Sequence, residues 1–446
     1  MAPCDAAVRR RVVLFPLPYL GHMIPMLRLA AALHAGGHAI TVLHTELHAP
    51  DPACYPADYR FVAVAAPDLP AASEDIAAFL AALNASCGAA FKDRLAALLA
   101  EGGVRCVVTD VVWFSAQAAA RDLGVPALAL MTSSAASFRT FMAYPALLAK
   151  GHLPYDESRA DAPVEELPPF RVRDLQRIDA SSLDTFAGLL ERFVDAARRS
   201  SGLIVNTFDA IEGPEVGDIR DGLSLPVFPV GPLNRFSPPP PQEGSSSCLD
   251  WLDNQSPGSV LFVSLGTVAS VDAHELAELA WALAEAGRPF VWVVRPGMVR
   301  GRPSCPLELP GDLAEQIGDR GMVVPWAPQE KVLGHAAVGA FLTHSGWNST
   351  VEALSEGVPM ACLPCFGDQF GTARYACAVW KVGVEVGRLE RGGVRAAIDR
   401  LMGPGIEGEE IRERARDLKG KVGRCVGEGG SSHMALLGLL ERIASF

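Results

Sequence analysis

Short hydrophobic runs alternate with longer amphipathic segments along the first half of the chain. Runs rich in Val, Leu and Ile without polar alternation occur at 11–17, 38–44, 104–110 and 125–131. Segments with helical periodicity, most of them ending in Gly, occur between them at 25–37, 72–100 and 115–124. Strands that are hydrophobic on both faces and alternate with helices are typical of a covered parallel sheet. This half is predicted to be a doubly wound α/β domain.

The same alternation resumes after residue 247. Hydrophobic runs recur at 259–266, 289–294, 321–326, 338–344 and 358–364, with a helical segment at 274–287. Between the halves, residues 234–247 read NRFSPPPPQEGSSS, a composition that suits an exposed linker. We therefore predict an N-terminal domain over 1–233, a linker over 234–247 and a C-terminal domain over 248–430. The last segment, 431–446, is apolar on more than one face and is expected to pack back on the N-terminal domain.

Size and composition narrow the class of protein. At 446 residues, with 49% apolar and 20% charged positions, the chain suits two globular domains. A net charge of -12 argues against a nucleic-acid partner, because it offers no broad basic field. The basic and apolar start resembles a signal peptide, but two prolines interrupt it, and no other run is long enough to span a membrane. The ten cysteines are scattered, so we expect reduced thiols and a cytoplasmic protein.

The absence of several known motifs disfavours some classes of ligand. Neither half contains G-x-G-x-x-G or G-x-x-x-x-G-K-[ST], which disfavours an NAD-dependent oxidoreductase and a P-loop enzyme. No D-x-D pair is present to hold a nucleotide sugar through a metal. Four histidines fall between 34 and 48, but Gly36 and Gly37 separate His34 from His38, and we predict no metal site there.

Residues 340–359, AFLTHSGWNSTVEALSEGVP, place a strand, a tight turn and a helix start next to one another. A helix start of this kind is a common anion site, because backbone N–H groups of its first turn point outward. The alternative is a capping box, in which Ser349 caps the helix and Glu352 folds back onto a backbone N–H. The residues alone leave both interpretations open.

A longer stretch around this turn carries a family resemblance. Residues 326–369, from WAPQ through HSGWNS to FGDQ, resemble the 44-residue signature of plant secondary-product glycosyltransferases, in glycosyltransferase family 1. PLPYLGHMIPM near the start, VGPL and SLGTV extend the resemblance over most of the chain. It implies the α/β fold called GT-B: two facing Rossmann-like domains with a cleft between them, and a C-terminal helix that packs back on the N-terminal domain.

The resemblance also implies a UDP-sugar site. In such a site an indole stacks on the uracil ring and a backbone amide forms hydrogen bonds with the edge of the base. A side-chain amide and a carboxylate bind the ribose hydroxyls, and polar groups at the helix start bind the diphosphate. The implied UDP-binding residues are Trp326, Ala327, Gln329, His344, Trp347, Asn348, Ser349, Glu352, Ser264 and Thr267. The implied sugar-binding residues are Thr132, Trp347, Asp368 and Gln369, with the terminal Gln resembling members that prefer UDP-glucose. Without the resemblance, a core residue at the domain junction is the favoured interpretation of Trp326. Glu352 is expected to cap the helix until nucleotide binds.

The implied catalytic pair is His22 and Asp110. His22 follows the first strand, in what is expected to be a loop, and Asp110 ends another strand. A neutral imidazole suits removal of an acceptor hydroxyl proton, and a carboxylate would fix its tautomer. A lone histidine in such a loop is otherwise a surface or packing residue.

The resulting prediction is an inverting, metal-independent UDP-glucosyltransferase without a cofactor. It would act as a monomer on a small lipophilic hydroxylated plant metabolite and give a β-O-glucoside. The alternatives are a catalytically inactive nucleotide-sugar-binding homologue and a GT-B nucleotide-sugar epimerase. The sequence does not specify the acceptor.

Overall fold

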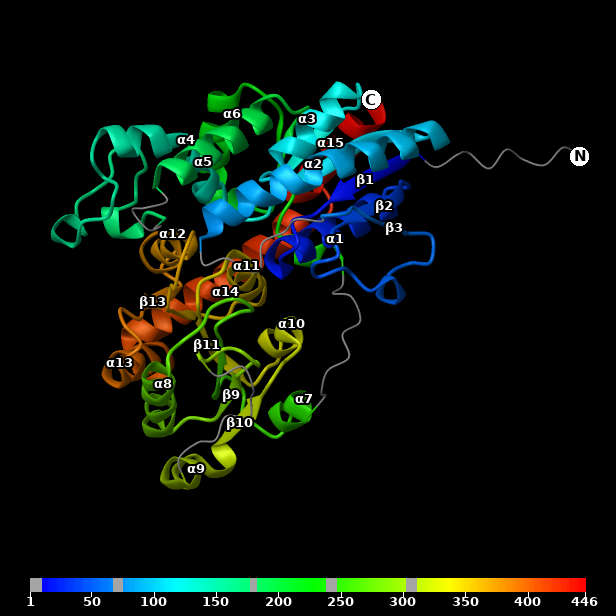
Figure 1. The fold of residues 1–446 in the computed structure, drawn as a ribbon. Helices are drawn as coiled ribbons and strands as arrows, with labels where there is room; N and C mark the ends of the chain where they lie inside the picture. Colours follow the sequence, from blue (N-terminus) through cyan, green and yellow to red (C-terminus); the bar gives the residue numbers. More distant parts are fainter. Residues whose placement is uncertain (1–9, 67–74, 177–182, 238–246, 302–310) are drawn as a thin grey trace, which may run out of the picture. The chain divides into compact units, whose positions relative to one another are not determined.

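A computed structural model describes residues 10–66, 75–176, 183–237, 247–301 and 311–446 (Figure 1). The chain divides into two compact units. The first comprises residues 1–154, 178–241 and 425–446, and the second comprises 155–177 and 242–424. Each unit is built on one parallel sheet.

The N-terminal unit contains a seven-stranded sheet in the order β3-β2-β1-β4-β5-β6-β7. Its strands are β1 (Arg11–Phe15), β2 (Ala39–His44), β3 (Arg60–Ala63), β4 (Val104–Asp110), β5 (Ala127–Met131), β6 (Leu203–Val205) and β7 (Val227–Pro229). Its helices are α1 (Leu20–Ala35), α2 (Ile76–Glu101), α3 (Phe114–Asp122), α4 (Ala135–Ala149), α5 (Leu183–Arg198), α6 (Asp209–Leu223) and α15 (Ser431–Ser445).

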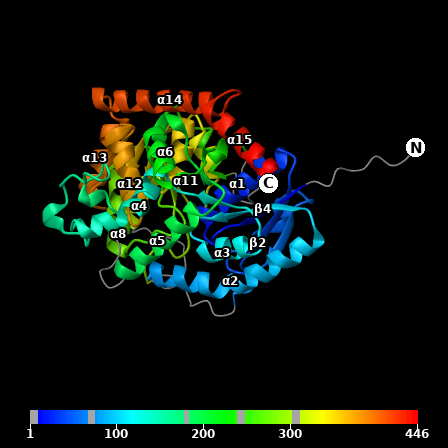
Figure 2. The same cartoon turned by 90° about the horizontal axis from the view of Figure 1, so that it is seen from above.

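Alternate residues of β1 reach opposite faces of this sheet. Val12 and Leu14 belong to a buried cluster that includes residues of α1 and, from the C-terminal helix α15, Leu439 and Ile443. Phe15 faces the other way and stacks on Trp113, with ring centroids 4.5 Å apart. Figure 2 shows α1 and α15 on one side of these strands and α2 and α3 on the other. A strand buried on both faces explains why the sequence shows no polar alternation.

The C-terminal unit contains a six-stranded sheet in the order β10-β9-β8-β11-β12-β13. Its strands are β8 (Val260–Ser264), β9 (Phe290–Val293), β10 (Gly321–Val324), β11 (Val338–Thr343), β12 (Met360–Cys362) and β13 (Gly383–Glu385). Its helices are α7 (Ser247–Leu252), α8 (Ala273–Ala286), α9 (Gly311–Ile317), α10 (Gln329–Leu333), α11 (Trp347–Glu356), α12 (Gln369–Arg374), α13 (Arg391–Met402) and α14 (Ile406–Val426), whose last turn crosses into the first unit.

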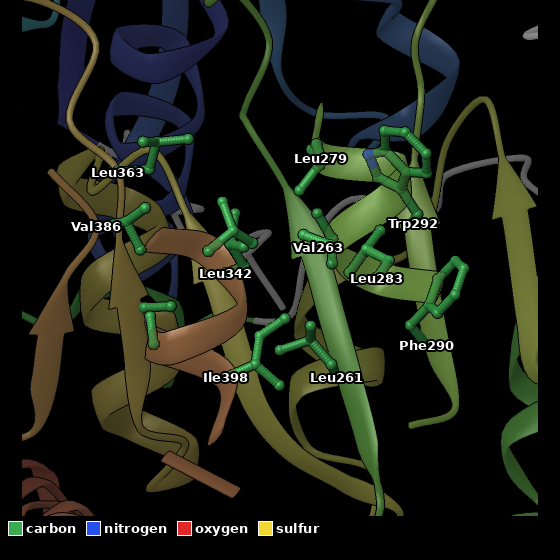
Figure 3. Close-up of a cluster of buried hydrophobic side chains, with 14 of the residues drawn as sticks. Leu261, Val263, Leu279, Leu283, Phe290, Trp292, Leu342, Leu363, Val386 and Ile398 are labelled. Atoms are coloured by element: carbon green, nitrogen blue, oxygen red, sulfur yellow. The ribbon is translucent and has the colours of Figure 1, made fainter. Parts of the chain in front are cut away.

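The core of the C-terminal unit lies between its sheet and helices α8 and α13. Leu261 and Val263 of β8 pack there with Leu279 and Leu283 of α8 and Ile398 of α13 (Figure 3). On the opposite face, the rings of Phe262 and Phe341 stack with centroids 5.0 Å apart. The two hydrophobic layers hold the strands in a fixed register, and this register positions the strand ends.

The predicted N-terminal domain over 1–233 is wrong in one part. Residues 155–177 belong to the second unit, because a short 3-10 turn, η3 (Val172–Asp174), packs against α12. Within the predicted linker, residues 238–246 lie outside the described part of the chain. Among the residues that the structure describes, no helix has the length and apolar character needed to cross a bilayer.

Candidate active site

Three polar side chains gather at the carboxyl ends of adjacent strands β1, β4 and β5. His22 follows β1, Asp110 ends β4 and Thr132 follows β5. The His22 Nδ1 atom lies 2.7 Å from Asp110 Oδ2 and 2.9 Å from Thr132 Oγ1. Asp110 is fully buried, whereas a third of the His22 side chain is exposed. The parallel strand order therefore brings together residues that are 88 and 110 positions apart.

The expectation that His22 lies in a loop is wrong. Helix α1 begins at Leu20 and places His22 in its first turn, where the backbone N–H groups of His22 and Met23 both donate to Tyr19 O. Pro25 lies inside the helix and does not mark its start. Because the helix fixes the backbone of His22, its imidazole has a defined direction toward Asp110.

The hydrogen bonds at His22 define its chemistry. A buried carboxylate next to Nδ1 favours the tautomer in which Nδ1–H donates to Asp110 Oδ2, since an ionised carboxylate can only accept. Asp110 Oδ1 is fixed in turn by the backbone N–H of Val112, at 3.2 Å. The lone pair of the neutral imidazole is then on Nε2. A partly exposed imidazole of this kind can accept a proton from a bound hydroxyl group.

A second group of polar residues lies at the strand ends of the C-terminal unit. Ser264 ends β8 beside Thr343 of β11, and His344 follows directly. Gly266 and Gly346 border the His344 ring so closely that a methyl group on either glycine would clash with it; on Gly266 it would lie 2.5 Å from Nε2. The loop after β8 and the start of α11 therefore meet at His344.

His344 is uncharged at neutral pH. Burial and, to a lesser extent, the nearby Arg295 guanidinium together lower its pKa to about 4. Its Nδ1 atom is buried and has no hydrogen-bond partner among the described residues. A neutral imidazole can contribute one hydrogen bond to an anion but no charge.

Arg295 is a site residue that the sequence analysis missed. Its Nε atom donates to Gly266 O at 3.1 Å, and its Nη2 atom donates to Ala269 O. The guanidinium thus holds the loop after β8, which contains Thr267, and brings a positive charge near His344. Its position two residues after β9 (Phe290–Val293), at a strand end, is the signal that could have identified it.

Gln329, Ser349 and Glu352 form one hydrogen-bonded group. The Gln329 Nε2 atom donates to Ser349 Oγ at 2.9 Å and to Glu352 Oε2 at 2.8 Å. The capping-box prediction is wrong, because α11 begins at Trp347 with Gly346 as its N-cap, and Ser349 is therefore already inside the first turn. Glu352 faces Gln329 of α10 instead of folding back on its own helix.

The remaining predicted residues of the C-terminal unit vary in burial. Trp326 is partly exposed two residues after β10, Ala327 is buried, Thr267 is exposed, and Asn348 is partly exposed in the first turn of α11. The Trp347 indole is buried and lies 6.3 Å from that of Trp380. Asp368 is the N-cap of α12 and Gln369 its first residue.

The histidines between 34 and 48 each have a separate partner. His34 contacts Asp58, whereas His38, His44 and His48 contact backbone carbonyls of Arg10, Thr45 and Pro18. Over the described ranges, no group of three or more His, Cys, Asp or Glu residues is arranged to hold a metal ion. The described cysteines are free thiols.

Comparisons with known proteins agree with this architecture. The family model for UDP-glucoronosyl and UDP-glucosyl transferases matches residues 243–412. DIMBOA UDP-glucosyltransferase BX8 of Zea mays is 55% identical over 448 residues, covering 96% of this chain and 97% of that protein. The chain belongs to the plant UDP-glycosyltransferase family. Within that family it is a UDP-glucosyltransferase.

Solved structures place the fold in the GT-B class. A UDP-glucosyltransferase from Polygonum tinctorium capable of glucosylating indoxyl has a TM-score of 0.86 at 28% identity, covering 98% of this chain and 99% of that one. Phytolacca americana UGT2, complexed with UDP-2fluoro-glucose and pterostilbene, has a TM-score of 0.83 at 28% identity, covering 97% and 99%. The predicted family, fold and enzyme class are confirmed.

Proposed function

We propose that the protein transfers glucose from UDP-glucose to a hydroxyl group of a small lipophilic plant metabolite, with inversion and without a metal ion. The observation that carries this proposal is the pairing of His22 with Asp110, 2.7 Å apart, with the histidine partly exposed and the carboxylate buried. This arrangement supports a role for His22 as the general base that removes the proton of the acceptor hydroxyl.

The proposed step needs only the two substrates. His22 Nε2 accepts the acceptor O–H proton while the acceptor oxygen attacks the anomeric carbon of glucose. The bond from that carbon to the UDP oxygen breaks, and UDP leaves with the electron pair. Asp110 stabilises the imidazolium that forms, and attack opposite to the leaving group converts an α-linked sugar into a β-O-glucoside. General-base assistance of this kind contributes roughly 10²- to 10⁴-fold.

The donor is proposed to bind in the C-terminal unit. Gln329 and Glu352 would hold the ribose hydroxyls, exchanging their mutual hydrogen bond for bonds to the ligand. Ser264, Thr267, His344, Asn348 and Ser349 would hold the diphosphate, with Trp326 and Ala327 on uracil. Asp368 and Gln369 would bind the sugar hydroxyls. Thr132, through its contact with His22, would lie beside the reacting sugar.

DIMBOA is the acceptor that we propose to test first, because a relative with 55% identity over nearly the whole length is a DIMBOA UDP-glucosyltransferase. A monomer, a cytoplasmic location and independence from metal ions also belong to the proposal. The Arg295 guanidinium near His344 supports metal independence, because it can offset part of the diphosphate charge.

The test incubates the protein with UDP-[¹⁴C]glucose, DIMBOA and a library of phenols and terpenoids, with and without EDTA. We expect a labelled glucoside whose anomeric proton coupling identifies a β linkage, formed equally with the chelator. UDP binding without transfer to any acceptor would indicate an inactive homologue. Conversion of UDP-glucose without an acceptor product would indicate an epimerase, and inhibition by EDTA would contradict metal independence.

A further inference from the structure

Helix α12 is fixed by a segment that comes from another part of the sequence. Residues 155–177 lie between α4 and α5 in the chain, yet they belong to the C-terminal unit. There η3 packs against α12, the helix whose N-cap is Asp368 and whose first residue is Gln369 (Figure 1). The segment contacts α12 in three ways: through an ion pair, through a hydrogen bond to a backbone carbonyl, and through the packing of an aromatic ring.

Asp174 is the centre of the charged contacts. It is 5% exposed and accepts hydrogen bonds from the Arg171 backbone N–H at 2.8 Å and from Arg171 Nε at 3.1 Å. Arg374, the last residue of α12, places its Nε atom 3.5 Å from the same carboxylate. A buried carboxylate held by two guanidinium groups has a fixed geometry, since moving either partner leaves charge poorly compensated.

Arg374 also contacts the backbone of the segment. Its Nε atom donates to Pro169 O at 3.0 Å, across 205 residues of sequence. The C-terminal end of α12 is thereby tied to the segment at two points, a carbonyl and a carboxylate. Beyond Arg374 the helical backbone continues as a π-helical turn, η7 (Tyr375–Val379), so these two contacts hold a continuous helical segment near its middle.

Phe170 provides the ring contact on the same helix. It is buried, its ring lies edge-on to that of Tyr375, the residue directly after α12, with centroids 5.7 Å apart, and it faces Gly371 within the helix. A methyl group on Gly371 would lie 3.0 Å from Phe170 Cζ, closer than ordinary carbon contacts. The absence of a side chain at position 371 therefore lets the helix approach the segment.

The first turn of α12 transmits this position to the residues proposed to bind sugar. Gln369 Oε1 accepts backbone N–H groups of Cys365 and Phe366 at 2.8 and 3.1 Å, and Thr372 Oγ1 donates to Asp368 O at 3.2 Å. Arg374 lies five residues beyond Gln369, about 8 Å along a helix. A displacement at the Arg374 end is therefore carried directly to Asp368 and Gln369.

From these contacts we propose that Phe170, Asp174 and Arg374 are positioning residues for the donor sugar. They set the position of α12, and through it the fit of Asp368 and Gln369 to the glucosyl hydroxyls. The proposal rests on the proposed function, because it presupposes that these two residues bind the sugar. It assigns part of donor-sugar recognition to a segment from the first half of the sequence.

Two variants test the proposal without removing a residue that binds the donor. Gly371→Ala pushes Phe170 away while favouring the helical backbone, since Ala has a higher helix propensity than Gly. Arg374→Lys keeps the charge but cannot hold Pro169 O and Asp174 in one planar geometry. We expect each to raise KM for UDP-glucose or lower kcat about tenfold, and to increase the ratio of UDP-galactose to UDP-glucose use. The Kd of UDP should stay within twofold of the wild-type value.

The matched control is Glu165→Ala, which removes an exposed carboxylate from the same segment. It should leave all constants unchanged. Adding Phe170→Leu to Gly371→Ala should restore much of the loss by making room for the methyl group. Unchanged kinetics and sugar preference in folded variants would overturn the proposal, as would an equal loss of UDP and UDP-glucose affinity. If the wild-type protein transfers no glucose, the proposed function fails. In that case the inference is still tested by binding: it is supported if Gly371→Ala weakens the affinity for UDP-glucose but not for UDP.

Discussion

Asp110 Oδ2 lies 2.7 Å from His22 Nδ1, and the carboxylate is fully buried while the imidazole reaches solvent. Asp110 is the last residue of β4. His22 lies in the first turn of α1, the helix that follows the neighbouring strand β1. Because the carboxylate has its second oxygen fixed by Val112 N, the imidazole is held in one orientation. The accessible nitrogen is then Nε2, the one proposed to accept the proton.

Asp110→Asn should lower kcat by about 10²- to 10⁴-fold. An Asn amide at this site can present its NH₂ group to Nδ1, which favours the tautomer with the proton on Nε2 and removes the base. Steady-state kinetics with UDP-glucose and the best acceptor measure the effect, and calorimetry should show UDP affinity within twofold of wild type. A kcat within threefold of wild type would show that Asp110 has no part in catalysis.

Gln329→Ala and Glu352→Ala should each weaken UDP binding by roughly tenfold. Gln329 Nε2 contacts the Glu352 carboxylate at 2.8 Å, so removing either changes the surroundings of the other. The double variant should therefore lose less affinity than the sum of the two single losses. Isothermal titration with UDP measures this coupling. Additive losses would mean that the two side chains contact the ligand independently.

Glu356→Ala is the control for that experiment. Glu356 lies one helical turn further along α11 and pairs with Lys419 at 2.9 Å. Its removal takes away a carboxylate from the same helix without affecting Gln329. UDP affinity should not change. A tenfold loss in this variant would mean that the losses in the Gln329 and Glu352 variants come from a disturbed helix and not from lost contacts with the ligand.

Gly266→Ala should reduce UDP affinity at least tenfold. The added methyl group would lie 2.5 Å from His344 Cε1 and Nε2 and displace the ring. Gly287→Ala is the matched control, because Gly287 has a similar φ of +66° against +70° but nothing within 4 Å of the added carbon. Both should lose about 1 kcal/mol of stability from the left-handed backbone. Equal UDP affinity in the two variants would show that the His344 contact is not needed for binding.

Glu212 should make stability depend on pH. It is fully buried, and its carboxylate accepts hydrogen bonds from Ala135 N, Ala136 N and Thr207 Oγ1 at the start of α4. Burial outweighs these donors and raises its pKa to about 7, from an ordinary value of 4.5. Between these values the folded protein keeps a proton that the unfolded chain has lost. Stability from this group is therefore lost as the pH rises from 4.5 to 7.

Glu212→Gln removes this titration and provides the measurement. Denaturant unfolding of both proteins at pH 5 and pH 8 gives the difference in unfolding free energy between wild type and variant. The unfolding free energy of the wild type minus that of the variant should fall by about 2 to 3 kcal/mol from pH 5 to pH 8, because only the wild type loses stability over this range. A difference that does not vary with pH would mean that Glu212 is already ionised at pH 5.

Much of the fold follows from local pattern. The strands ending at Phe15, Asp110 and Met131 were predictable because runs hydrophobic on both faces have few alternatives to a buried parallel strand. The parallel arrangement then places His22 and Asp110 at the same edge of the sheet. Their direct contact was predicted only through the family resemblance, because spacing alone does not determine which strands are neighbours.

The errors arose where distant contacts override a local motif. Ser349 and Glu352 fit a capping box in sequence, but α11 starts earlier and both side chains bond to Gln329, about 20 residues away. Residues 155–177 read as part of the N-terminal domain, yet the Asp174–Arg374 contact joins them to the other unit. Neither interaction can be read from a local sequence pattern, because the partners are far apart in the chain.

The central claim is that His22 is the base for glucosyl transfer. The most direct measurement compares wild-type and His22→Ala protein in UDP release and glucoside formation, with UDP-glucose and DIMBOA or the best acceptor of the library. The account predicts that turnover in the variant falls by at least 100-fold, while the Kd of UDP stays within twofold. Turnover within a few fold of wild type, with UDP binding intact, would contradict it.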